Sequence, residues 1–186
     1  NEHKKLLSGN FHQIVDLGDK YLILDEKRGI LEVTKEFEVT KEFGFRMDSF
    51  SHGLTVCKER RKIFIARSGL DVISVFDLDS YEFINDIIIS EKTEKYGRDM
   101  HHMNDLWAHG DYLYVSLFSH SGNVPNSIYD GGVLQVSLED YSVRHKLIKD
   151  AWMPHSVTFI GGELYYLDSM RSKLLRGDKQ VIGEFA

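Results

Sequence analysis

Four segments of the chain follow one plan, and this repetition limits the fold more than any other feature of the sequence. Each segment holds runs of four to seven residues rich in Val, Ile, Leu, Tyr and Phe, separated by turns with Gly, Asp, Ser or charged residues. Such runs are typical of antiparallel strands joined by hairpins. The equivalent first runs begin at residues 12, 52, 104 and 155, so the repeat is 40 to 52 residues long.

A fourth, more charged run closes each segment, as an exposed outer strand should. These runs cover residues 37–40, 82–89, 142–148 and 180–185. Four strands per unit at this spacing predict an all-β fold, a β-propeller of four-stranded antiparallel blades. We expect one domain over 1–186 with four blades, at about 11–46, 50–90, 101–149 and 152–186. A β-sandwich or open barrel is the alternative, but it does not explain the aligned starts. A single helical turn is expected near 91–96.

Composition narrows the classes of partner. The chain of 186 residues carries a net charge of −6 and has no basic block, which argues against nucleic-acid binding. No apolar run approaches the roughly 20 residues of a membrane span. Cys57 is the only cysteine, so no internal disulfide forms, and its apolar neighbours predict a small buried side chain. This cysteine usage is compatible with a reducing compartment, and we expect a cytoplasmic protein.

The aligned starts carry an unusual set of polar side chains. In a propeller the first strand of every blade lines the central channel, so equivalent positions converge on one face although they are distant in sequence. The starts are His12, His52, Asn104 and His155, and the third lies in the run His101-His102-Met103-Asn104-Asp105. We therefore expect up to four histidines, one amide and one carboxylate in a single funnel.

Two kinds of chemistry suit such a cluster. Imidazole is a common ligand of divalent metals, and such an ion activates water or polarises a substrate oxygen. A metal-free histidine instead serves as general acid or base, because its pKa lies near neutrality. We expect His52, His102 and His155 to be metal ligands or acid/base groups. The alternative is structural: polar strand starts that bond to neighbouring blades and hold water in the channel.

The loops between second and third strands open on the same face. Three are short, at 25–28, 67–69 and 168–171, whereas the third blade has a long loop from about 118 to 131. A loop of that length is more often functional than idle, and it predicts a lid or specificity loop over the funnel, with His120, Asn123 and Asn126 as contacts. Arg67 and Arg171 are candidates to clamp an anionic group. Ion pairs of these arginines with Asp25 and Asp168 are the alternative.

Three stretches resemble a family of uncharacterised bacterial β-propeller proteins. They are His102-Met-Asn-Asp-Leu-Trp-Ala, Gly131-Gly-Val-Leu, and Met153-Pro-His-Ser-Val-Thr-Phe-Ile-Gly-Gly-Glu-Leu-Tyr-Tyr-Leu-Asp-Ser. The resemblance is specific from about 98 to 178. It implies a propeller, and it singles out His102, Asn104, His155, Ser156, Asp168 and Ser169. It implies no particular reaction.

The organisation is also distantly similar to lactonase-type propellers, which hold a divalent metal at the starts of inner strands. Here histidine stands where that group has an acidic ligand, which favours a softer metal than calcium. The bacterial family needs further blades, about six in all. Three alternatives follow: residues 4–11 complete the last blade, the chain is part of a longer protein, or an open blade edge pairs with a second copy.

The function expected from the sequence is that of an enzyme, a hydrolase or lyase acting on a small polar ligand, with one divalent metal ion. His52, His102 and His155 would be its catalytic or metal-binding groups. The expected ligand contacts are His12, Arg67, Asn104, Asp105, Ser156, Asp168 and Arg171. The competing hypothesis is a non-catalytic binding or scaffold propeller, in which the channel histidines are structural.

Overall fold

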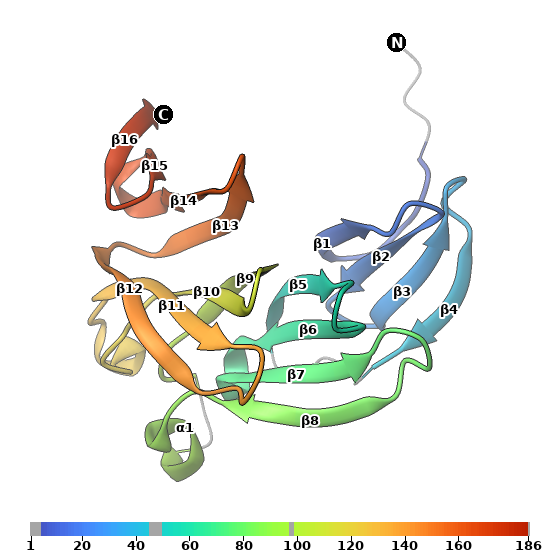
Figure 1. Cartoon of the computed structure of the whole chain (residues 1–186), viewed down its shortest axis with the longest axis horizontal. Coiled ribbons are helices and arrows are strands. Elements are labelled where there is room, and N and C mark those ends of the chain that lie inside the picture. The colour runs from blue at the N-terminus through green and yellow to red at the C-terminus, as the bar shows by residue number, and fades with distance from the viewer. Residues whose placement is uncertain (1–4, 45–49, 97–98, 186) are drawn as a thin grey trace.

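The computed structural model describes residues 5–44, 50–96 and 99–185, and within them it confirms the four-bladed β-propeller. Each blade is a four-stranded antiparallel sheet whose spatial order follows the chain (Figure 1). The expected helical turn is α1 (Glu91–Tyr96). His3, a histidine near the N-terminus that we expected to be exposed to solvent, lies outside the described residues. No helix in the described ranges is long and apolar enough to span a membrane.

The strands have the following bounds. Blade 1 consists of β1 (Phe11–Asp16), β2 (Lys20–Asp25), β3 (Gly29–Thr34) and β4 (Val39–Phe43). Blade 2 consists of β5 (Ser51–Cys57), β6 (Lys62–Arg67), β7 (Val72–Asp77) and β8 (Phe83–Ile88). Blade 3 consists of β9 (Met103–His109), β10 (Tyr112–Leu117), β11 (Gly131–Ser137) and β12 (Val143–Ala151). Blade 4 consists of β13 (Pro154–Ile160), β14 (Glu163–Asp168), β15 (Lys173–Arg176) and β16 (Gln180–Glu184).

The hydrophobic core lies between blades rather than at one centre. Leu22, Ile30, Leu54 and Phe76 pack in the cluster of blades 1 and 2. A second cluster joins blades 2 and 3, and a third joins blades 3 and 4. The middle strands of blades 2 and 3 are therefore buried on both faces. The outer strands β4, β8, β12 and β16 are mostly exposed, as their charged sequences predicted. Cys57 is buried in the second cluster, also as expected.

The innermost strands approach each other so closely that one position requires glycine. A Cβ atom on Gly53 of β5 would lie 2.9 Å from the Cα of Asp105 on β9. That distance is shorter than real Cβ contacts, and the neighbouring atom is backbone, which moves only with its strand. Gly53 thus allows blades 2 and 3 to bring the starts of their first strands together.

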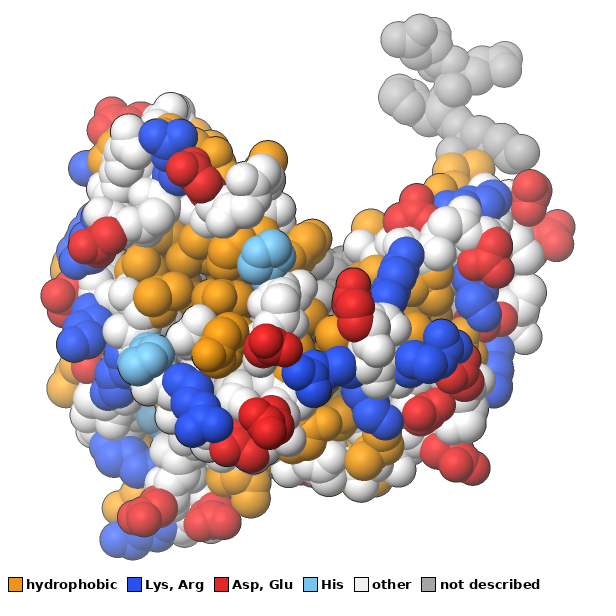
Figure 2. Space-filling model, in the orientation of Figure 1, with side chains coloured by type: hydrophobic (Ala, Val, Ile, Leu, Met, Phe, Trp, Pro, Cys, Tyr) orange, Lys and Arg blue, Asp and Glu red, His pale blue; other side chains and the backbone are white. Residues whose placement is uncertain are grey.

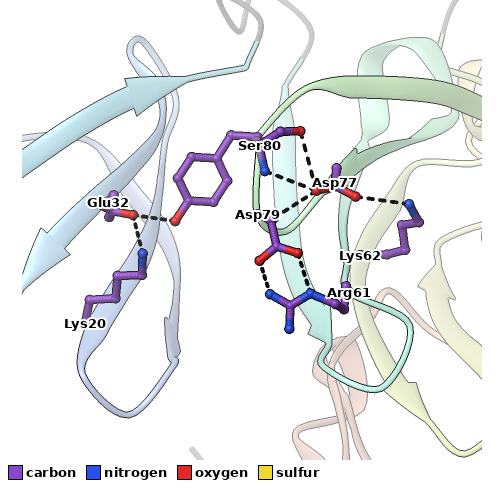
Figure 3. Close-up of polar contacts among 8 residues, drawn as sticks. Lys20, Glu32, Arg61, Lys62, Asp77, Asp79 and Ser80 are labelled. Atoms are coloured by element: carbon purple, nitrogen blue, oxygen red, sulfur yellow. Dashed lines mark hydrogen bonds and ion pairs between the residues drawn. The ribbon is translucent and has the colours of Figure 1, made fainter.

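Polar contacts hold the rims of blades 1 and 2 (Figure 3). Glu32 of β3 accepts hydrogen bonds from Lys20 of β2, at 2.5 Å, and from the hydroxyl of Tyr81 in blade 2. Burial raises the pKa of Glu32, but these bonds and one from Thr40 outweigh it and lower the value to about 2. The Tyr81 ring also stacks on Phe43, with 4.1 Å between ring centroids. Blade 1 is therefore joined to blade 2 by the hydrogen bond from Tyr81 to the Glu32 carboxylate as well as by apolar packing.

Aspartate side chains stabilise hairpin turns by accepting hydrogen bonds from backbone N–H groups of the turn. In the turn after β7, Oδ1 of Asp77 accepts hydrogen bonds from the backbone N–H groups of Asp79 and Ser80, at 2.9 and 3.1 Å. Asp79 in turn pairs with Arg61, in the turn between β5 and β6 (Figure 3). Asp and Ser favour such turns because their side chains replace missing backbone partners.

The four blades follow an arc in which first strands contact in the order β1, β5, β9, β13. Blades 1 and 4 stand apart in Figure 1, and Figure 2 shows a hollow between them. The expectation that residues 4–11 complete the last blade is wrong for the part described: Leu7 packs on blade 1, and β16 is the last strand of its own sheet. The backbone N–H of Asn10 holds this segment by donating to Asp25. Self-association stays a prediction.

Candidate functional site

The starts of the four first strands meet in one pocket of about 270 Å³, here called the histidine pocket. Its lining comes from all four blades: His12, Gln13, His52, His102, Asn104, Asp105, Phe118, His155 and Ser156. Seven of these residues lie at strand starts that the repeat aligned or directly next to them, because equivalent positions of successive blades face the same axis. The arrangement places imidazole, amide and carboxylate groups around a space large enough for a small molecule.

Aromatic rings run in a row across the pocket. The ring centroids of His12 and His52 are 4.9 Å apart, and those of His52 and His102 are 5.5 Å apart. Phe118 follows, 4.3 Å from His102, and His155 lies 5.3 Å beyond Phe118. Phe118 therefore contacts the rings of both His102 and His155, which the sequence had grouped with His52 around one ion.

Hydrogen bonds fix both the backbone and the imidazole ring of His102. Its φ of 49° is left-handed, and its backbone N–H donates to Oδ1 of the buried Asp71 at 3.0 Å. The same carboxylate accepts from the backbone of Met100 and His101. The imidazole Nδ1 lies 2.5 Å from Oδ2 of Asp99. Because an ionised carboxylate only accepts, Nδ1 carries a proton, and in the neutral ring Nε2 is the nitrogen with the free lone pair.

His155 is oriented in a similar way. Its Nδ1 lies 2.7 Å from the carbonyl oxygen of Met153 and 2.8 Å from the hydroxyl of Ser169. The carbonyl can only accept, so Nδ1 is again the protonated nitrogen. Burial lowers the pKa of His155. Ser169, which the family resemblance singled out, thus contacts the ring that it follows by fourteen residues.

His52 is neutral at physiological pH. Burial is the main cause that lowers its pKa to about 4, and the nearby imidazoles of His102, His12 and His155 add to the effect. A neutral imidazole accepts hydrogen bonds and does not attract anions. The centre of the pocket therefore suits hydroxyl groups and neutral oxygen functions.

Two buried polar atoms of the pocket have no partner among the described residues. Nδ2 of Asn104 is one, although the side chain is only 7% exposed, and Nε2 of His12 is the other, 4.0 Å from Glu26. Unsatisfied buried donors are costly unless a ligand or water meets them. Next to Asn104, burial raises the pKa of Asp105 to about 6, although its carboxylate accepts bonds from the backbone of Leu106 and Ser156.

Three expected ligand contacts lie outside the pocket lining. Nη1 of Arg171 is 2.9 Å from Oδ2 of Asp168, which is the ion pair that the sequence left open. Asp168 also accepts the backbone N–H of Trp152. Arg67 lies 3.9 Å from Asp86 of its own blade. These side chains fix turns and strands next to the histidine pocket.

The long loop of blade 3 is anchored by hydrogen bonds to α1 and to β12. The ammonium of Lys92, in α1, donates to the carbonyl of Ser121 at 2.7 Å and to Oδ1 of Asn123 at 3.3 Å. His120 bonds through Nε2 to the carbonyl of Ile148 at 2.7 Å. Phe118 is the residue by which this loop lines the histidine pocket. His120, Asn123 and Asn126, expected as ligand contacts, lie outside the lining.

Other histidines have structural partners. Buried His101 lies between Ser90 and the carbonyl of Ser119, at 2.6 and 2.8 Å. His109 stacks on Phe159 of blade 4 with 4.1 Å between ring centroids, a contact that the sequence did not indicate. His145 is exposed on β12. Sequence reasoning missed Asp99 and Phe118, and the three-residue spacing of Asp99 and His102 was the available signal.

The metal expected from the sequence would be held by His52, His102 and His155. Among residues 5–44, 50–96 and 99–185, no three His, Cys, Asp or Glu side chains are grouped closely enough to hold an ion. Phe118 contacts the rings of both His102 and His155. The expected divalent metal stays a prediction, and no catalytic step below depends on it.

Comparison with known proteins shows the fold. No family model matches the chain, and no curated protein matches its sequence. A protein of unknown function from Bacteroides caccae has a TM-score of 0.66 at 14% identity, covering 94% of this chain and 66% of that one. A proposed 6-phosphogluconolactonase from Bacteroides uniformis has a TM-score of 0.62 at 15% identity, covering 89% and 49%. The Cps50 (Swd1) propeller domain of Myceliophteria thermophila has a TM-score of 0.61 at 13% identity, covering 100% and 58%.

The chain spans 41% to 66% of the length of such solved structures. At identities of 9% to 15% the likeness concerns architecture and not activity. The bacterial family expected from the sequence motifs stays a prediction. What the comparisons and the structure establish together is that this chain has the β-propeller fold, similar to propellers of several different roles.

Proposed function

We propose that the protein is a hydrolase that binds a small polar substrate in the histidine pocket. The observation that carries the proposal is the pair Asp99–His102, in a pocket that also holds the unpartnered Asn104 amide. A carboxylate that fixes a neutral imidazole by its Nδ1–H leaves Nε2 ready to take a proton from water. This is the arrangement needed to attack an ester or lactone carbonyl.

The steps follow from the residues. Nε2 of His102 takes one proton from a water molecule, whose oxygen forms a bond to the carbonyl carbon. The Asp99 carboxylate stabilises the resulting imidazolium. Nδ2 of Asn104 donates a hydrogen bond to the carbonyl oxygen as it gains negative charge. The bond from carbon to the leaving oxygen then breaks, and that oxygen receives a proton from Asp105, whose pKa near 6 suits an acid.

The other two central histidines position the substrate in this proposal. His52 is neutral because of its lowered pKa, and His155 presents an unprotonated Nε2 because its Nδ1 faces a carbonyl. Both accept hydrogen bonds from hydroxyl groups. Phe118, which contacts the rings of His102 and His155, offers an apolar surface for the carbon skeleton. The expected substrate is therefore a small, hydroxylated ester or lactone.

A non-catalytic propeller is the second candidate. Direct ring contacts of His12 with His52 and of His52 with His102 join three blades, as structural channel histidines would. In that case loss of one imidazole would weaken the fold and change no reaction. The two candidate functions differ in one expectation: the hydrolase requires His102 for turnover, whereas the non-catalytic propeller has no turnover for His102 to support.

The test is hydrolysis of a panel of small lactones and aryl esters between pH 6 and 9. We expect turnover of at least one compound by the natural sequence. His102→Gln should lower kcat by about 100-fold or more, and Asp99→Asn by a factor of ten or more, since general base catalysis contributes about 10²–10⁴. His145→Gln, on an exposed outer strand, is the matched control and should keep full activity. Absence of turnover across the panel, or equal rates in all variants, contradicts a hydrolase.

A further inference from the structure

A second pocket, of about 350 Å³, lies beside the start of β13 and is here called the Trp152 pocket. It is lined by Ser127, Ile128, Tyr129, Asp130, Asp150 and Trp152. The long loop of blade 3 and the connection between blades 3 and 4 build it. We infer that the Trp152 pocket binds a sugar ring, stacked on the indole and bonded through its hydroxyl groups to the carboxylates.

Trp152 is held rigidly without being buried. Its side chain is 50% exposed, although its backbone N–H donates to Asp168 at 2.9 Å. The guanidinium of Arg171 lies 5.2 Å from the indole centroid and is itself fixed by Asp168 at 2.9 Å and by the carbonyl of Asp150 at 2.8 Å. A fixed aromatic ring loses little entropy when a ligand stacks on it. Such a ring suits recognition better than a mobile one.

The opposite wall is equally fixed. Ser119 donates to Asp130 at 2.5 Å, and Ser121 donates to the same carboxylate at 3.0 Å. The backbone N–H of Ile128 donates to the carbonyl of Asn123 at 3.2 Å. Ile128 is nonetheless 47% exposed, so the loop presents apolar surface to solvent from a preformed conformation. The pocket therefore exists before any ligand binds.

The polar groups favour a hydroxylated ligand over a charged one. The carboxylates of Asp130 and Asp150 accept hydrogen bonds and oppose phosphate or carboxylate ligands. Asp150 lies 3.9 Å from Lys179, and Arg171 already takes the place of a cation over the indole. A cationic ligand would therefore compete with the Arg171 guanidinium for the position over the Trp152 ring. The C–H faces of a sugar ring match the aromatic surface, and its hydroxyl groups match the carboxylates.

The two pockets are close along the chain. Trp152 precedes His155 by three residues, so their Cα atoms lie at most about 11 Å apart. The inference extends the proposed function by giving its substrate class, a sugar-derived ester or lactone, but sugar binding at Trp152 does not require His102 to act in catalysis.

The test uses the two tryptophans of the chain. In the variant Trp107→Phe, Trp152 is the single indole, and its emission reports binding directly. Glucose, N-acetylglucosamine, glucuronate and cellobiose serve as probes, each titrated to saturation. We expect a saturable change in emission with at least one of the neutral sugars.

Calorimetric titration of the same sugars provides the matched comparison. Trp152→Ala should weaken binding about tenfold or more, Trp152→Phe should restore part of it, and Trp107→Phe should leave the affinity unchanged. Circular dichroism confirms that each variant is folded. His102→Gln should keep sugar binding, which separates failure of this inference from failure of the proposed hydrolase. Lack of a saturable response to every probe, or equal affinity in folded Trp152→Ala, overturns the inference.

Discussion

Asp99 and His102 form a hydrogen-bonded pair at the start of the third blade, with 2.5 Å between Oδ2 and Nδ1. Three residues separate them in the sequence, and the turn that carries them is held by three backbone bonds to the buried Asp71. These backbone bonds fix the turn in the conformation that places the Asp99 carboxylate beside the His102 ring. It gives His102 a defined tautomer, and the proposed chemistry rests on that tautomer.

The stability of the protein should fall in acid through His52. Its pKa is about 4 in the folded state and about 6.5 when unfolded, so the unfolded chain binds more protons between these pH values. The contribution of His52 to the free energy of unfolding is complete above pH 6.5 and is lost as the pH falls toward 4. Thermal melting from pH 4 to 8 should show this decline, and His52→Gln should flatten it.

Asp105 provides a control, because its effect on the pH dependence of stability is opposite to that of His52. The pKa of Asp105 is raised to about 6, so its folded state binds more protons than the unfolded chain between about pH 4 and 6. Asp105 thus favours the folded state as the pH falls, and Asp105→Asn should steepen the acid decline that His52→Gln flattens. If both variants changed the slope in the same direction, the electrostatic description of the pocket would be wrong.

Packing of the first strands should tolerate no side chain at Gly53. The Cβ atom of Gly53→Ala would meet the Cα of Asp105 at 2.9 Å, and such overpacking costs about 1–3 kcal/mol. Urea denaturation measures the loss. Gly183→Ala on β16 is the control, since its Cβ would lie an ordinary 3.8 Å from Leu174 and should change stability by less than about 0.5 kcal/mol. Equal effects at both positions would contradict the close approach of β5 and β9.

Much of the fold could be predicted because its signals are local. Each hairpin is specified by short apolar runs and by turn residues such as Asp77 and Ser80, so the strands and α1 lie close to their predicted places. Topology then brings His12, His52, Asn104 and His155 together without further information. Equivalent positions of a repeat converge whenever the repeat is a propeller.

The rest of the site depends on interactions that the repeat does not encode. The left-handed backbone of His102 turns its ring toward Asp99, and the course of one irregular loop brings Phe118 into contact with both His102 and His155. Arg67 forms an ion pair with Asp86 of its own blade at 3.9 Å, a pairing that depends on side-chain reach within the blade. Such details follow from tertiary packing and not from periodicity.

Elemental analysis of purified protein tests the divalent metal predicted from the sequence. That prediction requires close to one ion per chain, lost in the double variant His102→Ala, His155→Ala. Retention of the ion in the folded double variant would place it elsewhere in the chain. A folded protein without bound metal would refute the prediction and leave the proposed action of His102 intact, since that action uses no ion.

The most direct test of the account is the protonation state of the His102 ring, read by nitrogen NMR of ¹⁵N-histidine-labelled protein at pH 7. His102→Gln identifies its signals, and His145 on the exposed outer strand is the internal control. We predict that the neutral form of the His102 ring carries its proton on Nδ1 and its free lone pair on Nε2, with loss of that preference in Asp99→Asn. A proton on Nε2 in the natural sequence would contradict the proposal, because His102 could then not take a proton from water at that atom.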